Sequence, residues 1–261
     1  MRMKSISLYQ ANGSWLTRLH PFTKLFYLVA AVSVPLIQGS LAMFLVTIFL
    51  SLLLLHSAHL VRKAVPLLAF SFTIILTIVL IQSLFNHANV HVLFSIGFLH
   101  FYREGLLYAA HIGGNILNML LAFAILVLTT APEELVEELE KKGFSPKFGY
   151  IINSVFQIIP EMIGTMHTIS DAQRSRGMET EGNLRTRIKA FLPLISPVVM
   201  SALTNTRERA IALEVRGFGA RARKTYLYEH PYQKNDQIIK WLSLAALTGS
   251  VLFRIVCLIQ R

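Results

Sequence analysis

The amino-acid sequence predicts an all-α, polytopic membrane protein with about five transmembrane helices and a cytoplasmic domain of amphipathic helices. Hydrophobic residues make up 54% of the 261 residues and charged residues only 15%, whereas soluble domains have about 25% charged residues. Residues 25–61 and residues 64–102 contain no Asp, Glu, Lys or Arg. Uncharged segments of this length are typical of chains that cross a bilayer.

Five apolar segments are expected to form the membrane helices, because each approaches the roughly 20 residues that a bilayer requires. They lie at residues 25–38, 41–58, 66–85, 105–130 and 238–259. Gln38, Gly39 and Ser40 are expected to form the turn between the first two. The chain therefore has three expected parts: N-terminal transmembrane helices in 1–130, a cytoplasmic domain in 131–237 and a C-terminal transmembrane helix in 238–261.

The basic residues predict the orientation in the cell membrane. The N-terminal segment and the loop around residue 60 carry six Lys and Arg without nearby acids: Arg2, Lys4, Arg18, Lys24, Arg62 and Lys63. Cytoplasmic loops are enriched in Lys and Arg, so the N-terminus is expected in the cytoplasm. This placement also accounts for the net charge of +11 without a nucleic-acid partner, and the lipid bilayer is the expected surroundings.

The segment 131–237 contains every acidic residue of the chain except Glu104. A first helix is expected there with Thr130 as its N-cap and Gly143 after its last turn. A second is expected over 148–176, with a kink or break at Pro160. A third is expected over 197–216, preceded by an apolar stretch, 191–195, that is too short to cross a membrane.

The second and third of these helices end alike. Ala172 through Gly177 and Ala212 through Gly217 both read Ala-x-x-x-Arg-Gly, and the two glycines lie 40 residues apart. Glycine adopts the left-handed conformation that ends a helix, and the preceding Arg176 or Arg216 sits at the negative end of the helix dipole. Many helices end in a basic residue and glycine, but the repeat favours a functional pair of cationic tips that bind carboxylates.

These features occur in an order that resembles the transmembrane T component of energy-coupling factor (ECF) transporters, the EcfT/CbiQ family. The similar stretches are Leu19-His20-Pro21-Phe22-Thr23-Lys24-Leu25, Thr129-Thr130-Ala131-Pro132-Glu133-Glu134-Leu135, Ile159-Pro160-Glu161 with Asp171 through Gly177, and Arg209-Ala210 with Val215 through Phe218. The resemblance covers nearly the whole chain. It implies a transmembrane coupling subunit that transmits ATP-driven motion during vitamin or metal-ion uptake.

The resemblance also implies the partners and the site. Residues 131–237 would contain the coupling helices. Their tips, Arg176 with Gly177 and Arg216 with Gly217, would bind two cytoplasmic ABC ATPase subunits, and Ser175 and Val215 replace the alanine usual in the family's Ala-Arg-Gly motifs. A separate membrane-embedded substrate-binding S component would rest on an apolar stripe. Its candidate residues are Val199, Leu203, Ala210 and Leu213, and packing of this stripe against the protein's own helices is the alternative.

Other chemistry has weaker support in the sequence. No Gly-x-x-x-x-Gly-Lys-Ser/Thr, His-Glu-x-x-His or Gly-x-Ser-x-Gly motif is present, so neither ATP hydrolysis nor protease activity is expected. His87, His91 and His100 are favoured as solvated loop residues over a metal site, and no metal or cofactor is expected. The alternatives are a membrane-bound enzyme and a secondary transporter, which would need ionisable residues at one membrane face or at mid-membrane.

Two polar residues of the fourth expected span, Asn115 and Asn118, are expected to bridge helices rather than bind a substrate. His111 lies beside them, where relatives often carry a basic residue. His20 is a further departure, because the family usually has Asp at this position.

Overall fold

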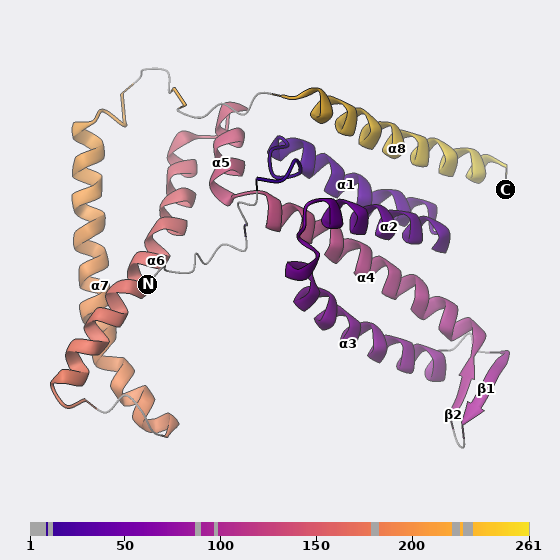
Figure 1. Ribbon diagram of the computed structural model, residues 1–261, viewed down its shortest axis with the longest axis horizontal. Coiled ribbons are helices and arrows are strands. Elements are labelled where there is room, and N and C mark those ends of the chain that lie inside the picture. The colour runs from indigo at the N-terminus through magenta and orange to yellow at the C-terminus, as the bar shows by residue number, and fades with distance from the viewer. Residues whose placement is uncertain are drawn as a thin grey trace. The chain divides into compact units, whose positions relative to one another are not determined.

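The computed structural model describes residues 9, 13–86, 90–96, 99–178, 183–220, 225–226 and 232–260. These residues form eight helices and one antiparallel hairpin (Figure 1). In chain order the elements are α1 (Pro21–Gln38), α2 (Leu41–Ser57), α3 (Val61–Phe85), β1 (Val92–Ile96), β2 (Leu99–Tyr102), α4 (Arg103–Thr129), α5 (Pro132–Lys141), α6 (Pro146–Ser175), α7 (Leu184–Val215) and α8 (Lys234–Ile259).

The chain divides into two compact units. The first, called the membrane unit below, comprises residues 7–138 and 230–261 and contains α1–α4, the hairpin and α8. The second, called the rod unit, comprises the described residues between 139 and 229 and contains α6 and α7. α5 runs across the boundary between these residue ranges.

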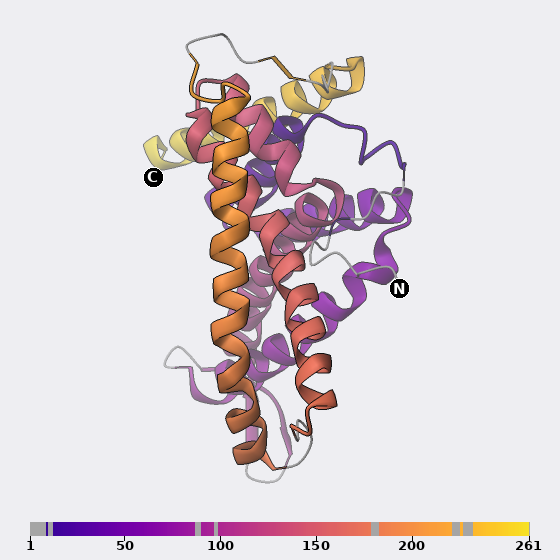
Figure 2. The ribbon, with the colours of Figure 1, turned by 90° about the vertical axis from the view of Figure 1, so that its left-hand side faces the viewer.

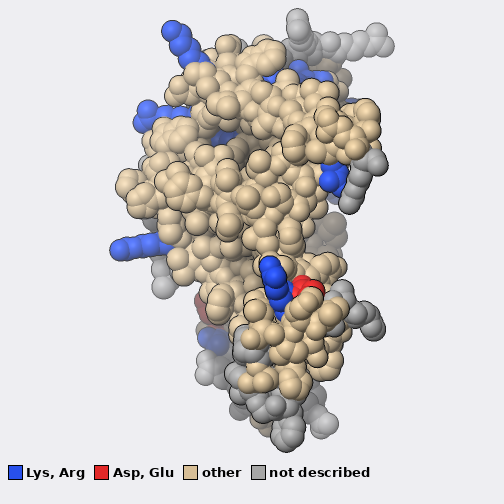
Figure 3. All heavy atoms as spheres, turned by 90° about the vertical axis from the view of Figure 1, so that its right-hand side faces the viewer, with Lys and Arg blue, Asp and Glu red and all other residues tan. Residues whose placement is uncertain are grey.

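The membrane unit confirms the predicted fold class. α1, α3, α4 and α8 are long and apolar enough to cross a bilayer, and α2 is a shorter apolar helix of 17 residues. Large apolar side chains of these helices point outward, among them Phe70 and Phe72. On the face seen in Figure 3, uncharged residues predominate and Lys and Arg are few and scattered. Such a surface is stable in lipid and would be a liability in water.

α4 lies at the centre of this unit, because it packs against α1, α2 and α3 while α8 packs against α1. The buried core includes Leu55, Leu121 and Ile125. The expected turn after α1 is present: Gly39 has φ +63°, and its N–H donates to the Pro35 carbonyl at 2.8 Å. The expected bridging role of Asn118 is confirmed, since its Nδ2 donates to the Ala31 carbonyl of α1 at 2.6 Å.

A buried group of polar residues joins the N-terminal ends of α1 and α8. The side chain of Asp236 is fully buried and accepts two backbone N–H groups, from His20 at 2.9 Å and from Gln233 at 2.9 Å. The second bond belongs to a capping box that starts α8. One carboxylate therefore begins α8 and also holds it to the residue that precedes α1.

His20 performs the capping role that an Asp could perform at this position. Its Nδ1 accepts the N–H of Phe22 at 3.2 Å, which satisfies a donor in the first turn of α1. Since Nδ1 accepts, Nε2 carries the proton and faces Glu138 Oε2 at 3.0 Å. The departure from the family pattern thus preserves the cap and adds a contact to α5.

Two other contacts complete this junction. The buried Lys24 Nζ donates to the Thr129 carbonyl at 2.7 Å, which ties α1 to the end of α4. The ring of Tyr232 stacks on that of His20, with centroids 3.9 Å apart. Burial raises the pKa of the Tyr232 hydroxyl, and the charges of Glu138 and Asp236 raise it further, so this ring stays neutral over the physiological range.

Several expectations about the helix boundaries were wrong. Thr130 ends α4 and is not the N-cap of α5, whose first backbone bond, from Leu135, goes to the Ala131 carbonyl at 3.3 Å. Of the kink or break expected at Pro160, the break is absent, because α6 continues through this residue. α7 begins at Leu184 rather than at Pro197, and it includes the stretch 191–195. A proline removes one backbone bond, and helices of 30 and 32 residues keep their others.

We expect Asp236→Ala to lower the unfolding temperature of the purified protein in detergent, because two buried backbone donors lose their acceptor. An unsatisfied buried donor costs about 1–3 kcal/mol. The matched control is Asp171→Ala on the exposed side of α6, which should leave the transition unchanged. Equal unfolding temperatures for the two variants would contradict the role given to Asp236.

Candidate functional site

The rod unit is built on two long helices. α6 has 30 residues and α7 has 32, which corresponds to lengths of about 45 Å and 48 Å at 1.5 Å per residue. Figures 1 and 2 show them side by side and crossing, with the C-terminal ends of α6 and α7 at opposite ends of the pair. The two Arg-Gly tips therefore lie far apart.

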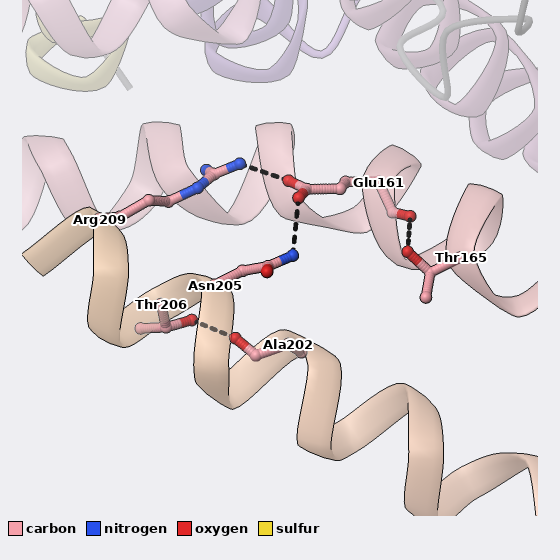
Figure 4. A network of polar contacts seen from close by, with 6 residues as sticks. All are labelled: Glu161, Thr165, Ala202, Asn205, Thr206 and Arg209. Carbon is pink, nitrogen blue, oxygen red and sulfur yellow. Dashed lines mark hydrogen bonds and ion pairs between the residues drawn. The ribbon is translucent and has the colours of Figure 1, made fainter.

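A polar clasp fixes the crossing. Glu161 of α6 forms an ion pair with Arg209 of α7, and its other carboxylate oxygen accepts the Asn205 Nδ2 at 3.1 Å (Figure 4). Asn205 and Arg209 are four residues apart, so both lie on the face of α7 that meets α6. The ion pair is partly exposed, so it stabilises the contact modestly and acts mainly by selecting one register of the two rods.

The remaining contact between the rods is small and close-packed. Ile158 and Met162 of α6 meet Val198 and Ala202 of α7 around a cavity of only about 10 Å³. This clasp was missed at the level of sequence, although Glu161 and Arg209 both lie in the stretches that resemble the ECF family. The feature of the sequence that could have indicated the clasp is Glu161, an acid in the middle of one expected amphipathic helix, together with Arg209, a base in the next.

Both tips have the predicted backbone geometry. Gly177 has φ +88° and Gly217 has φ +75°. Met178 N–H donates to the Gln173 carbonyl at 3.1 Å, and Phe218 N–H donates to the Leu213 carbonyl at 3.0 Å. The glycine N–H groups donate to Arg174 at 2.9 Å and Glu214 at 3.0 Å. Both helices thus end in a Schellman motif, which requires the left-handed residue that glycine supplies.

The two arginines that precede these glycines are exposed C-cap residues. Within the described part of the chain, neither the Arg176 nor the Arg216 guanidinium has a hydrogen-bond or ion-pair partner. Beside them, Ser175 Oγ donates to the Asp171 carbonyl at 3.1 Å, and Val215 is 83% exposed. Each tip therefore presents an unpaired planar cation at the end of a rigid helix, a geometry suited to bidentate binding of a carboxylate.

α5 ends in the same hydrogen-bond pattern. Gly143 has φ +104°, its N–H donates to the Glu140 carbonyl at 3.0 Å, and Phe144 N–H donates to the Leu139 carbonyl at 3.1 Å. α5 has only 10 residues. The hydrogen-bond pattern of the cap therefore does not distinguish the two tips from the end of α5. What distinguishes them is the length of α6 and α7.

The candidate apolar stripe lies on α7. Val199 and Leu203 are 43% and 61% exposed, Ala210 is exposed, and Leu213 is half-buried. The residues of α7 that meet α6 are different ones, among them Val198 and Ala202. α6 also exposes large apolar side chains, including Phe148 and Ile151. An exposed apolar surface of this extent indicates contact with lipid or with a partner protein.

The loop histidines that the structure describes do not form a metal site. His91 Nδ1 lies 2.7 Å from Glu104 Oε1 beside the hairpin, and His87 lies outside the described residues. Among the described residues there is no group of three or more His, Cys, Asp or Glu that could hold a metal ion. In the fourth span, His111 packs edge-on against the Phe44 ring of α2, and no described polar group bonds the Asn115 Oδ1.

Comparison with known proteins decides the family. Residues 12–227 match CbiQ, described as a cobalt transport protein. The chain belongs to the CbiQ family. Relatives of this CbiQ chain include the energy-coupling factor transporter transmembrane protein EcfT of Lactococcus lactis, which is 28% identical over 88% of this chain and 90% of the relative. The EcfT of Leuconostoc gelidum is 32% identical over 69% of both chains, and that of Bacillus subtilis is 28% identical over 85% of this chain and 87% of the relative.

Membership of the CbiQ family confirms the resemblance found in the sequence and the predicted function class, a transmembrane component of a transporter. It does not favour a membrane-bound enzyme or an autonomous secondary transporter. The family match extends from the segment before α1 to beyond α7. Both tips and the clasp therefore lie within it.

We expect Glu161→Ala to broaden the distribution of distances between the two rods, because α7 loses both polar contacts to α6. Spin labels at Ala172→Cys and Ala212→Cys in a Cys257→Ser background would report this distance by pulsed electron paramagnetic resonance. Glu208→Ala is the matched control, since Glu208 is exposed and adjacent to Arg209. Indistinguishable distributions for the two variants would show that Glu161 does not hold the crossing.

Proposed function

We propose that this chain is the transmembrane coupling subunit of an ECF-type importer and that its rod unit transmits motion from two cytoplasmic ABC ATPase subunits. The observation that carries the proposal is the pair of unpaired arginines, Arg176 and Arg216, at opposite ends of two crossed rods. The two tips are alike but far apart, so each would bind its own site, and the two sites would be alike. The chain has no phosphate-binding loop, so the nucleotide chemistry belongs to those partners.

The chemistry of each tip defines the partner surface. A guanidinium at a helix C-terminus binds an acidic groove, and the following glycine has no side chain to hold the two backbones apart. Closure of the ATPase pair on ATP would bring the two partner sites together and swing the rods about the clasp. A crossing fixed by Glu161 and Arg209 converts that swing into motion at the membrane.

The second partner is a small membrane-embedded substrate-binding S component. The exposed stripe of Val199, Leu203 and Ala210 on α7, with Leu213 at its half-buried end, supports a contact with an apolar protein surface. Rotation of α7 about the clasp would then tilt the S component in the bilayer. In this mechanism the S component selects the vitamin or metal ion, and the present chain supplies only the coupling.

The proposed location is the cell membrane, with the N-terminus in the cytoplasm. The support is the excess of basic residues in the sequence up to the first turn of α1 and at the start of α3, in contrast to the uncharged α1–α2 turn. With this orientation the junction around Asp236 lies at the cytoplasmic face. Residues 139–229 then begin on the cytoplasmic side, where the ATPases act.

We expect Arg176→Glu combined with Arg216→Glu to abolish co-purification of the ATPase pair and substrate uptake by the reconstituted transporter. A charge-assisted bond contributes about 1.5–3 kcal/mol, so loss of two with reversed charge weakens binding by a factor of at least about 100. Arg207→Glu is the control, because Arg207 is exposed on α7 but distant from the tip in sequence. Normal assembly of the double variant would refute the role of the tips.

A separate variant tests the S-component contact. Leu203→Arg should reduce co-purification of the S component while the ATPases remain bound, because a charge replaces a side chain that the partner would bury. Thr204→Arg places the same charge at the next exposed position of α7 and should be tolerated. If both variants retain the S component equally, the apolar stripe is not the surface that binds it.

A further inference from the structure

An apolar groove lies in the membrane unit on the surface of α1. Its floor is formed by α1 residues from Thr23 to Val34, and its walls come from α2, α8 and the segment before α1, with Ile125 of α4 beneath. The half-open groove has a volume of about 340 Å³, within the range of small-molecule sites. Nothing in the coupling mechanism uses this groove.

The groove has the length of one leaflet. From Thr23 to Val34 the floor extends over 11 residues of helix, or about 16 Å. Half of a bilayer's hydrocarbon core is about 15 Å. The groove starts at the N-terminal ends of α1 and α8, where the polar junction around Asp236 lies, and it extends toward the middle of both helices. The groove therefore runs in the direction that an acyl chain takes in one leaflet, the leaflet nearer the basic N-terminal end of α1.

The polar groups at the start of the groove match the ester and headgroup region of a lipid. Thr23 lies at the start of the floor and is 1% exposed, and its Oγ1 has no hydrogen-bond partner among the described residues. A buried hydroxyl without a partner is costly in an apolar environment, and an ester carbonyl is an acceptor that a lipid supplies. Trp15, an amphipathic side chain typical of the membrane interface, lines the same end.

The charges near this end are mainly basic. Arg18 is exposed, Lys24 is buried in the floor, and Lys240 Nζ lies 5.5 Å from the centre of the Phe26 ring on α1. The nearby Asp236 is fully buried, and its two oxygens accept backbone N–H groups of His20 and Gln233. Glu134 is partly exposed and also interacts with the buried Lys24. Arg18 and Lys240 together outweigh this one accessible acid, so the net accessible charge at this end is positive, which favours an anionic lipid.

We propose that this groove binds one acyl chain of an anionic phospholipid, with its ester carbonyl at Thr23 and its headgroup beside Lys240. A partner helix about 10 Å in diameter could lie across the mouth of the groove but could not enter a cavity of about 340 Å³. An acyl chain is thin enough to enter.

Fluorescence of Trp15 tests the proposal in the full chain. Trp241→Phe removes the other tryptophan, and the protein is reconstituted in phosphatidylcholine vesicles that contain phosphatidylglycerol brominated on its acyl chains. We expect Trp15 to be quenched at a mole fraction of this probe several-fold lower than that needed with brominated phosphatidylcholine. Equal quenching by the two lipids would overturn the anionic preference.

Two adjacent alanines of α8 provide matched variants. Both are exposed, but only Ala246 lines the groove. Ala246→Phe should raise the mole fraction of probe needed for half-quenching at least threefold, whereas Ala245→Phe should leave it unchanged. The near-isosteric Thr23→Val should shift the curve in the same direction as Ala246→Phe. Coincident curves for Ala245→Phe and Ala246→Phe would overturn the proposal.

A second measurement is independent of Trp15. Native mass spectrometry should find one phospholipid retained on the parent protein and on Ala245→Phe, and none on Ala246→Phe. The same difference should persist in the complete transporter with its ATPases and S component. Its loss on assembly would assign the groove to a partner and overturn the proposal.

Discussion

The clasp between Glu161, Asn205 and Arg209 is the interaction on which the coupling geometry depends. α6 and α7 share a small apolar contact, and most of their large apolar side chains point elsewhere. Two rods with so little mutual burial would slide or pivot freely without a directional contact. One carboxylate with a donor on each oxygen gives the crossing a single register. The apolar faces then remain available for lipid and for partners.

The junction at Asp236 has the corresponding role in the membrane unit. In a bilayer a backbone donor without an acceptor is expensive, and helix starts are where such donors occur. His20 and Asp236 accept backbone N–H groups at the starts of α1 and α8. Glu138 of α5 contacts His20 and so belongs to the same polar group. The chain thus passes from the membrane helices to α5 through a hydrogen-bonded junction, although the Oγ1 atoms of Thr23 and Thr130 have no partner among the described residues.

Local signals in the sequence predicted most of the fold. Uncharged apolar segments identified the membrane helices, and the Arg-Gly pairs identified two helix ends whose glycines do have positive φ. The helix start expected at Pro197 was wrong and α6 is not broken at Pro160, because a long helix tolerates the loss of single backbone hydrogen bonds. The clasp and the groove on α1 were not predicted, since pairing between distant helices leaves no periodic pattern in one sequence.

The position of the clasp gives the two tips unequal leverage. Glu161 lies 15 residues before Arg176, and Arg209 lies seven residues before Arg216, so the arms from fulcrum to tip measure about 22 Å and 10 Å. For one angular swing of a stiff crossing, the α6 tip travels about twice as far as the α7 tip. At equal work the α7 end delivers about twice the force. A force applied at either tip would therefore act through a different lever arm, with a longer and weaker motion at the α6 tip and a shorter and stronger motion at the α7 tip.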